Sequence, residues 1–182
     1  MSAVNETEPS SRIELIDPVP EMGLAYRRFL QEFIDAGEEG MLLHLPDETE
    51  APEDCVRRLL DHAAGLNLPD GWVPCSTFWL VSDEEVLLGE VRIRHRLTPA
   101  LEDYGGHIGY MVRPDWRGKG HATRMLALAL EKARVLKLRR VLVTCDRGNA
   151  ASARVVLKNG GNLASESDAK AGRVTSRYWI EL

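Results

Sequence analysis

The 182-residue sequence predicts an α/β fold with a central mixed β-sheet and helices on both of its faces. Short runs of β-branched and aromatic residues recur along the chain, and segments with apolar residues at helical spacing separate them. The run 139–146 (RRVLVTCD) is largely apolar, which is typical of a strand covered on both faces. The length favours one domain, which we place at residues 12–182, after a polar tail at 1–11 that we expect to be disordered.

Turn residues and periodicity divide the chain into ten predicted elements. Pro52 suits the first turn of a helix, and Gly65 suits its end. The acidic residues 83–85 connect two strand-like runs and predict a hairpin. Phe78, Trp79, Tyr178 and Trp179 lie on predicted strands and are expected in the core. The elements are a strand at 12–18, helices at 22–34 and 52–64, strands at 76–82, 86–97 and 107–112, a helix at 122–137, a strand at 139–146, a helix at 149–159 and a strand at 173–182, with a loop at 98–106.

The composition argues against several classes of protein. Three cysteines without a CxxC pair make a disulfide framework or zinc ribbon improbable and favour a cytoplasmic location. We expect no membrane span, because no apolar run approaches the roughly 20 residues needed to cross a bilayer. The polar N-terminus has no features of a signal peptide. The five histidines, at positions 44, 62, 95, 107 and 121, lack HxH and HExxH spacing, so we expect no metal site.

The charge is distributed unevenly along the chain. Residues 1–70 carry 5 Lys and Arg against 16 Asp and Glu, whereas residues 71–182 carry 18 against 12. The basic part is compatible with nucleic acid or with a phosphorylated small molecule, and the acidic part with a cationic substrate. The basic stretch 92–96 (RIRHR) has no interleaved aromatic residue and lies on a predicted strand, so we expect no nucleic-acid partner.

The stretch 110–133, YMVRPDWRGKGHATRMLALALEKA, places two glycines and two cations between a strand and a helix. A helix N-terminus presents unpaired amide N–H groups and the positive end of the helix dipole. Gly118 and Gly120 would let the chain direct successive amides to one point, which predicts a phosphate site. The pattern matches neither GxxxxGK[ST] nor GxGxxG.

The spacing Arg117-x-x-Gly120-x-Ala122 resembles the R/Q-x-x-G-x-G/A pyrophosphate signature of the GNAT family of acyl-CoA-dependent N-acetyltransferases. The stretch 141–161, VLVTCDRGNAASARVVLKNGG, is similar to the strand and Asn-x-x-Ser/Ala helix that follow in that family. The resemblance covers about residues 77–163 and is closest to a bacterial group with the pattern GGHIGY…RP…RGKGxAT…TCDxxNxxS…NGG. It implies that the strands 107–112 and 141–145 splay apart and that acetyl-CoA enters between them.

The resemblance also assigns roles to individual residues. The backbone of Met111, Val112 and Arg113 would pair with the pantetheine arm, and the amide of Met111 or Val112 could polarise the thioester carbonyl. Residues of two further groups would bind coenzyme A. They are the loop residues Arg117, Gly118, Lys119, Gly120, His121, Ala122 and Thr123 and the helix residues Asn149, Ser152 and Arg154, with Arg124 and Lys158 near the phosphates.

The resemblance leaves the acid and the base of the reaction open. Many family members carry a Tyr seven residues after the Asn, where this chain has Val156. Tyr110, Tyr104 or a water would then protonate the leaving thiolate, or it would leave without an acid. An alkylammonium acceptor must lose a proton before it attacks, and His107 is the first candidate for the base, with Glu90 second. Cys145 is expected to be a structural thiol rather than a nucleophile.

Three functions follow from these observations. The first is an enzyme that transfers acetyl from acetyl-CoA to a primary amine of a small molecule, peptide or protein by direct attack in a ternary complex. The second is a non-catalytic acyl-CoA-binding module, which the absent Tyr would fit, and the third is a nucleic-acid-associated protein. The amine acceptor stays undetermined, and exposed strand edges are compatible with a homodimer.

Overall fold

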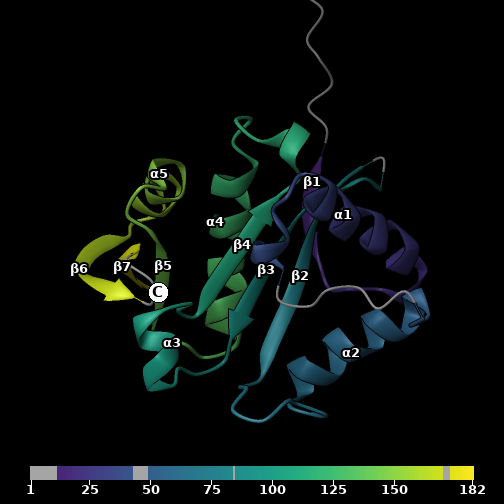
Figure 1. The fold of residues 1–182 in the computed structure, drawn as a ribbon, viewed down its shortest axis with the longest axis horizontal. Coiled ribbons are helices and arrows are strands. Elements are labelled where there is room, and N and C mark those ends of the chain that lie inside the picture. The colour runs from purple at the N-terminus through teal and green to yellow at the C-terminus, as the bar shows by residue number, and fades with distance from the viewer. Residues whose placement is uncertain (1–11, 43–48, 84, 170–172) are drawn as a thin grey trace, which may run out of the picture.

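A seven-stranded sheet in the order β1-β2-β3-β4-β5-β7-β6 forms the centre of the protein (Figure 1). The computed structural model describes residues 12–42, 49–83, 85–169 and 173–182, so the predicted disordered tail and His44 lie outside the described residues. Neighbouring strands are antiparallel except β4 and β5, which are parallel. The strands are β1 Ile13–Ile16, β2 Cys75–Ser82, β3 Leu87–Arg94, β4 Ile108–Val112, β5 Arg140–Asp146, β6 Asn162–Ala169 and β7 Arg173–Glu181.

Helices cover both faces of this sheet, as the sequence predicts. α1 and α2 pack on one face and α4 and α5 on the other (Figure 1). Pro52 occupies the first turn of α2, and Gly65 ends that helix with a left-handed φ of 77°. The helices are α1 Gly23–Asp35, α2 Pro52–Ala64, α3 Pro99–Asp103, α4 His121–Val135 and α5 Ala150–Lys158, with 3-10 turns η1 Pro20–Met22, η2 Glu39–Met41 and η3 Pro114–Trp116.

Two elements differ from the predicted order. The sequence predicts a loop at 98–106, but this segment contains α3, where the Thr98 hydroxyl accepts a hydrogen bond from the Leu101 N–H at 3.3 Å. The sequence predicts no strand between residues 159 and 173, whereas β6 lies there and pairs with β7. β6 is an edge strand with exposed side chains such as Leu163 and Glu166. Because no buried face is needed there, no hydrophobic periodicity marks it.

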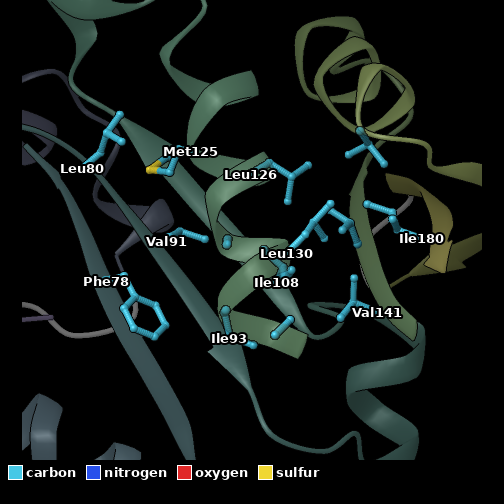
Figure 2. Packing of buried hydrophobic residues seen from close by; sticks show 14 of the residues in the cluster. Phe78, Leu80, Val91, Ile93, Ile108, Met125, Leu126, Leu130, Val141 and Ile180 are labelled. Atoms are coloured by element: carbon cyan, nitrogen blue, oxygen red, sulfur yellow. The ribbon is translucent and has the colours of Figure 1, made fainter. Parts of the chain in front are cut away.

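The larger core lies between the sheet and α4. Met125, Leu126 and Ala129 of α4 are fully buried against Val91 and Ile108 of the central strands (Figure 2). On the opposite face, Trp79 packs beneath Tyr26 of α1, with ring centroids 4.8 Å apart. The two clusters explain why residues on both faces of β2, β3 and β4 are buried.

Three of the four predicted core aromatics are buried. Phe78, Trp79 and Tyr178 are at most 6% exposed, whereas Trp179 is only partly buried and lies under the Arg140 guanidinium, 4.2 Å from its ring centroid. Side chains alternate between the faces of β7, so burying Tyr178 and Ile180 turns Trp179 to the other face.

Candidate active site

The two parallel strands β4 and β5 pair only where β4 begins. Between their described residues the ladder consists of the pair Ile108 and Val143, next to a 2.7 Å hydrogen bond from the His107 N–H to the Leu142 carbonyl. Beyond this point Tyr110 of β4 and Thr144 of β5 line a cavity instead of pairing. The predicted splay is therefore present, and it opens the sheet at its centre.

The pairing of β4 with β3 determines which backbone groups face this opening. The Arg113 N–H donates to the Leu88 carbonyl at 3.0 Å, and the Arg94 N–H donates to the His107 carbonyl at 2.8 Å. Backbone groups point alternately to the two sides of a strand, so those of Met111 point toward β3 and the N–H groups of Tyr110 and Val112 point toward the opening. The resemblance allows the amide of Met111 or of Val112 to polarise the thioester carbonyl, and only the Val112 N–H of these two points toward the opening.

The loop before α4 has the backbone conformation of an anion site. Gly118 and Gly120 have φ values of 76° and 87°, in the left-handed region that glycine adopts without strain. An ideal Cβ at either glycine would meet nothing within 4 Å, so φ rather than lack of space requires glycine here. Gly120 is the N-cap of α4, and no side chain caps the helix. Its first amides are therefore free to bind an anion.

Two cavities meet at the opening of the sheet. The loop cavity, about 550 Å³, lies over the loop before α4, and the sheet cavity, about 330 Å³, lies over β3, β4 and β5. Met41, Tyr110, Met111, Asn149 and Ser152 line both of them. Most of the predicted coenzyme A residues line the loop cavity: Met111, Val112, Arg117, Gly118, Gly120, His121, Ala122, Thr123, Asn149, Ser152 and Arg154.

The other two predicted coenzyme A residues have side-chain partners elsewhere. Arg113 directs its guanidinium to Glu32 of α1, with Nε 2.7 Å from the carboxylate. The Lys119 ammonium lies 4.6 Å from the ring centroid of Trp116, which lines the loop cavity. Lys119 thus stays at the rim of the cavity, whereas Arg113 points away from it.

The N-terminus of α5 holds Tyr110 in place. Asn149 caps the helix by accepting a hydrogen bond from the Ser152 N–H at 2.9 Å, and the Ser152 hydroxyl lies 2.9 Å from the Tyr110 hydroxyl. Burial, with a smaller contribution from the nearby Cys145, raises the pKa of Tyr110 to about 12 against the opposing effect of the hydrogen bond with Ser152. Tyr110 therefore keeps its proton at neutral pH. Val156, at the position of the family Tyr, is fully buried in the core.

Glu90 and Arg92 form a buried ion pair in the sheet cavity. Their exposures are 1% and 8%, and both line the cavity. Glu90 Oε2 and Arg92 Nε have no hydrogen-bond partner among the described residues. An irregularity in the β2–β3 ladder leaves Leu88 without a partner in β2 and places it in the α4 core. Leu88 therefore lies on the opposite face of β3 from Glu90, although strict alternation along the strand would place the two residues on one face.

His107 is held by the backbone rather than directed into the site. Its Nδ1 accepts a hydrogen bond from the Leu142 N–H at 2.9 Å, and its ring centroid is 6.0 Å from that of Trp179. It is not among the described residues that line either cavity. Burial, with Arg140 and Arg94 nearby, lowers the pKa of His107 to about 4. This geometry does not support His107 as the base.

His107 should instead make the fold sensitive to acid. The unfolded chain binds a proton at this position below about pH 6.5, whereas the folded protein does so only near pH 4. Stability should therefore fall as the pH falls from 6.5 toward 4, by up to about 1 kcal/mol per pH unit from this group. In His107→Gln this contribution should disappear. Urea unfolding at several pH values measures it, and parallel pH profiles for both proteins would refute the assignment.

Side chains that could bind a metal ion do not cluster among the described residues. No group of three or more His, Cys, Asp or Glu among them could hold a metal ion. In the same part of the chain, no helix is long and apolar enough to cross a membrane.

Splayed parallel strands beside an uncapped, glycine-rich helix N-terminus are the arrangement that the sequence resemblance to acyl-CoA-dependent acyltransferases implies. A model of the GNAT acetyltransferase domain matches residues 30–162, so the chain belongs to the GNAT acetyltransferase family. The protein is an acetyl-CoA-dependent N-acetyltransferase. The predicted fold, enzyme class and co-substrate are thereby confirmed.

Solved structures show the same fold at low sequence identity. RimL, a ribosomal L7/L12 alpha-N-protein acetyltransferase solved with coenzyme A, is 16% identical with a TM-score of 0.69, over 95% of both chains. The ribosomal-protein-S5-alanine acetyltransferase of Vibrio fischeri is 16% identical (TM-score 0.67; 93% of this chain, 92% of that one). RimJ of Mycobacterium smegmatis is 18% identical (TM-score 0.66; 95% and 83%). No curated protein sequence matches the chain significantly.

Sequence reasoning did not assign several residues that line these cavities, among them Met41, Glu38 and Arg92. Met41 lines both cavities, Glu38 lines the loop cavity, and Arg92 lines the sheet cavity beside Glu90. Arg92 was identifiable as the strand neighbour of Glu90 on the same face. Glu38 and Met41 follow α1, about 80 residues before the loop that they approach, and no local pattern marks them.

Proposed function

We propose that the protein acetylates a primary amine by direct attack of the amine on the thioester of acetyl-CoA in a ternary complex. The observation that carries this proposal is that the two cavities meet at Tyr110 and Met111. Coenzyme A in the loop cavity would bring its thioester to this junction, and an amine in the sheet cavity would reach it from the other side. No acyl-enzyme intermediate is then required.

Coenzyme A would bind mainly through backbone groups. The amides of residues 117–123 would hold the pyrophosphate at the N-terminus of α4. The Val112 N–H would donate to the thioester carbonyl and stabilise the oxyanion that forms during attack. Basic side chains around the loop cavity would bind the remaining phosphate: Lys119, His121, Arg124, Arg154 and Lys158.

Glu90 and Tyr110 would move the protons of the reaction. Glu90 lies directly opposite Met111 in the β3–β4 ladder and lines the sheet cavity, where its carboxylate would accept a proton from the acceptor ammonium. Tyr110 lines both cavities and keeps its proton at neutral pH, so it can protonate the coenzyme A thiolate as it leaves. Tyr110 would thus supply the hydroxyl that Val156 cannot.

The sheet cavity favours an α-amino group of a peptide or protein over a polycation. Beside Glu90 it contains the buried Arg92, whose Nε is free to donate to the first carbonyl of a peptide. Arg92 and Arg94 would repel a second ammonium group. This acceptor differs from the cationic one that the acidic first half of the chain suggests. RimL and the Vibrio fischeri enzyme are named as acetyltransferases of ribosomal proteins, which supports the same class.

An acceptor screen tests the proposed function. Acetyl-CoA is mixed with tripeptides starting with Ser or Ala, with the same peptides blocked at the N-terminus, and with spermidine, and the released thiol is measured. The free peptides should show a kcat/KM at least tenfold above that of spermidine, since one unpaired charge in a cavity is worth about 1.4 kcal/mol or more. Coenzyme A binding without thiol release on any amine would favour a non-catalytic module.

Cys145→Ser should retain transfer activity within a few-fold of wild type. Burial raises the pKa of the Cys145 thiol, so it is a poor nucleophile, and direct attack needs none. Initial rates at varied acetyl-CoA and acceptor concentrations should give intersecting lines in a double-reciprocal plot. Parallel lines together with an acetylated Cys145 detected by mass spectrometry would contradict direct attack.

We also propose a cytoplasmic location, which the free cysteines 55, 75 and 145 support. The exposed edge strand β6 would allow a homodimer. Sedimentation velocity measures the assembly state directly.

A further inference from the structure

The side chain of Arg117, the first residue of the pyrophosphate motif, is held by residues outside the loop that precedes α4. Its Nε donates to the Val112 carbonyl at 3.0 Å, and its Nη1 donates to Glu38 at 2.8 Å, with Nη2 on the other carboxylate oxygen. The guanidinium carbon lies 5.7 Å from the centroid of Phe33. The side chain thus joins the end of β4, the end of α1 and the chain that follows α1.

Glu38 begins a short segment that reaches the junction of the two cavities. Gly37 turns the chain after α1 with a φ of 69°, and the Glu38 N–H donates to the Phe33 carbonyl at 2.8 Å. The Met41 N–H then donates to the Glu38 carbonyl at 2.9 Å. Met41 lines both cavities, and Leu42 lines the sheet cavity. The backbone around Glu38 therefore determines where Met41 lies.

We propose that Glu38 is a positioning residue that couples coenzyme A binding to the acceptor side of the site. Bound pyrophosphate orders the loop 117–120, and the ordered loop holds the Arg117 side chain in one position. Arg117 then holds the Glu38 carboxylate, which keeps the backbone of segment 38–42 over the sheet cavity. The proposal rests on the proposed function, because it takes the sheet cavity as the acceptor site.

The charges of Arg117 and Glu38 support a connection between the loop cavity and segment 38–42. Glu38 lines the loop cavity, where an unpaired carboxylate would repel the pyrophosphate. Arg117 neutralises it, and this pairing lowers the pKa of the Glu38 carboxyl. The side chains of the pair are 41% and 30% exposed, so the ion pair contributes little to folding stability. Its geometry is therefore better explained by positioning than by stabilisation of the fold.

Hydrogen exchange with coenzyme A as the probe tests the coupling. In the wild type, coenzyme A should slow exchange in the loop 117–123 and also in segment 38–42, in the latter by about fivefold or more. In Glu38→Gln the loop should remain protected while the protection of segment 38–42 is lost. Glu39→Gln is the matched control, because it removes the same charge from the next residue, whose side chain is exposed. Its segment 38–42 should show the same protection from exchange as in the wild type. Thermal melts should show Tm values near wild type for both variants.

Each other outcome identifies which idea fails. Equal protection of segment 38–42 in wild type and Glu38→Gln, with the loop protected in both, would overturn the coupling and leave the proposed function intact. A protected loop with an unprotected segment in the wild type would overturn it as well. A loop that coenzyme A leaves unprotected in the wild type would overturn the proposed cofactor site and, with it, the coupling.

Discussion

Gly120→Asp should abolish coenzyme A binding while the protein still folds. Gly120 is the N-cap of α4, where the free amides converge and no side chain competes for them. A carboxylate there would occupy these amides and repel the pyrophosphate. A ligand at a hundred times its Kd stabilises the folded wild type by about 2.7 kcal/mol and raises its Tm. Thermal melts with and without coenzyme A, and calorimetric titration, should show no effect on the variant.

Two further variants separate the anion site from backbone strain. Gly71 also has a positive φ, 79°, with no atom within 4 Å of an ideal Cβ, and it lines neither cavity. Gly71→Asp should therefore show the same strain but bind coenzyme A normally. Gly120→Asn keeps the shape of Asp without its charge and should lose less affinity. A folded Gly120→Asp protein with wild-type affinity would show that the phosphates bind elsewhere.

Glu90→Gln should lower kcat by about a hundredfold or more while coenzyme A affinity stays near wild type. The amide cannot accept the proton that an alkylammonium must lose, and Glu90 lines the sheet cavity rather than the loop cavity. The loss should be much smaller for an acceptor amine whose conjugate acid has a pKa well below the assay pH, because that amine arrives deprotonated. Steady-state kinetics with both kinds of amine measures the difference.

Removal of a buried charge also disturbs the fold, so this experiment needs a structural control. Glu90→Gln leaves the Arg92 guanidinium without its partner, which costs about 3–5 kcal/mol in comparable buried pairs. Glu50→Gln removes a partly buried carboxylate that lies 3.0 Å from Arg58 and lines neither cavity. It should lower the Tm without lowering kcat. If Glu90→Gln slows both kinds of amine equally, Glu90 supports the structure and is not the base.

The cofactor loop was predictable from sequence because its conformation is encoded locally. Gly118 and Gly120 permit the positive φ values that the loop adopts, and the following apolar stripe forms α4. The apolar run of β5 likewise indicated a strand covered on both faces. Such features depend on neighbours within a few residues, which a single sequence contains.

Elements without a buried periodicity were not predictable in this way. β6 takes its position from hydrogen bonds to β7 and has exposed side chains, so nothing in its composition marks a strand. The irregularity between β2 and β3 places the Leu88 side chain in the core beside α4. A prediction that assumes regular alternation of side chains along β3 would place it on the opposite face. Register depends on the partner strand as well as on the strand itself.

The sequence by itself determined the α/β class and the family, and it predicted a backbone site for the phosphates, because glycine φ preferences and helix N-terminal amides act over short distances. Only the tertiary structure decided which side chains surround the reacting groups. It turned His107 into a buried acceptor for the Leu142 N–H, placed Val156 in the core, and brought Glu38 to Arg117 across 79 positions of the chain. Such contacts depend on how distant elements pack and pair, and packing is a property of the whole fold rather than of any one segment.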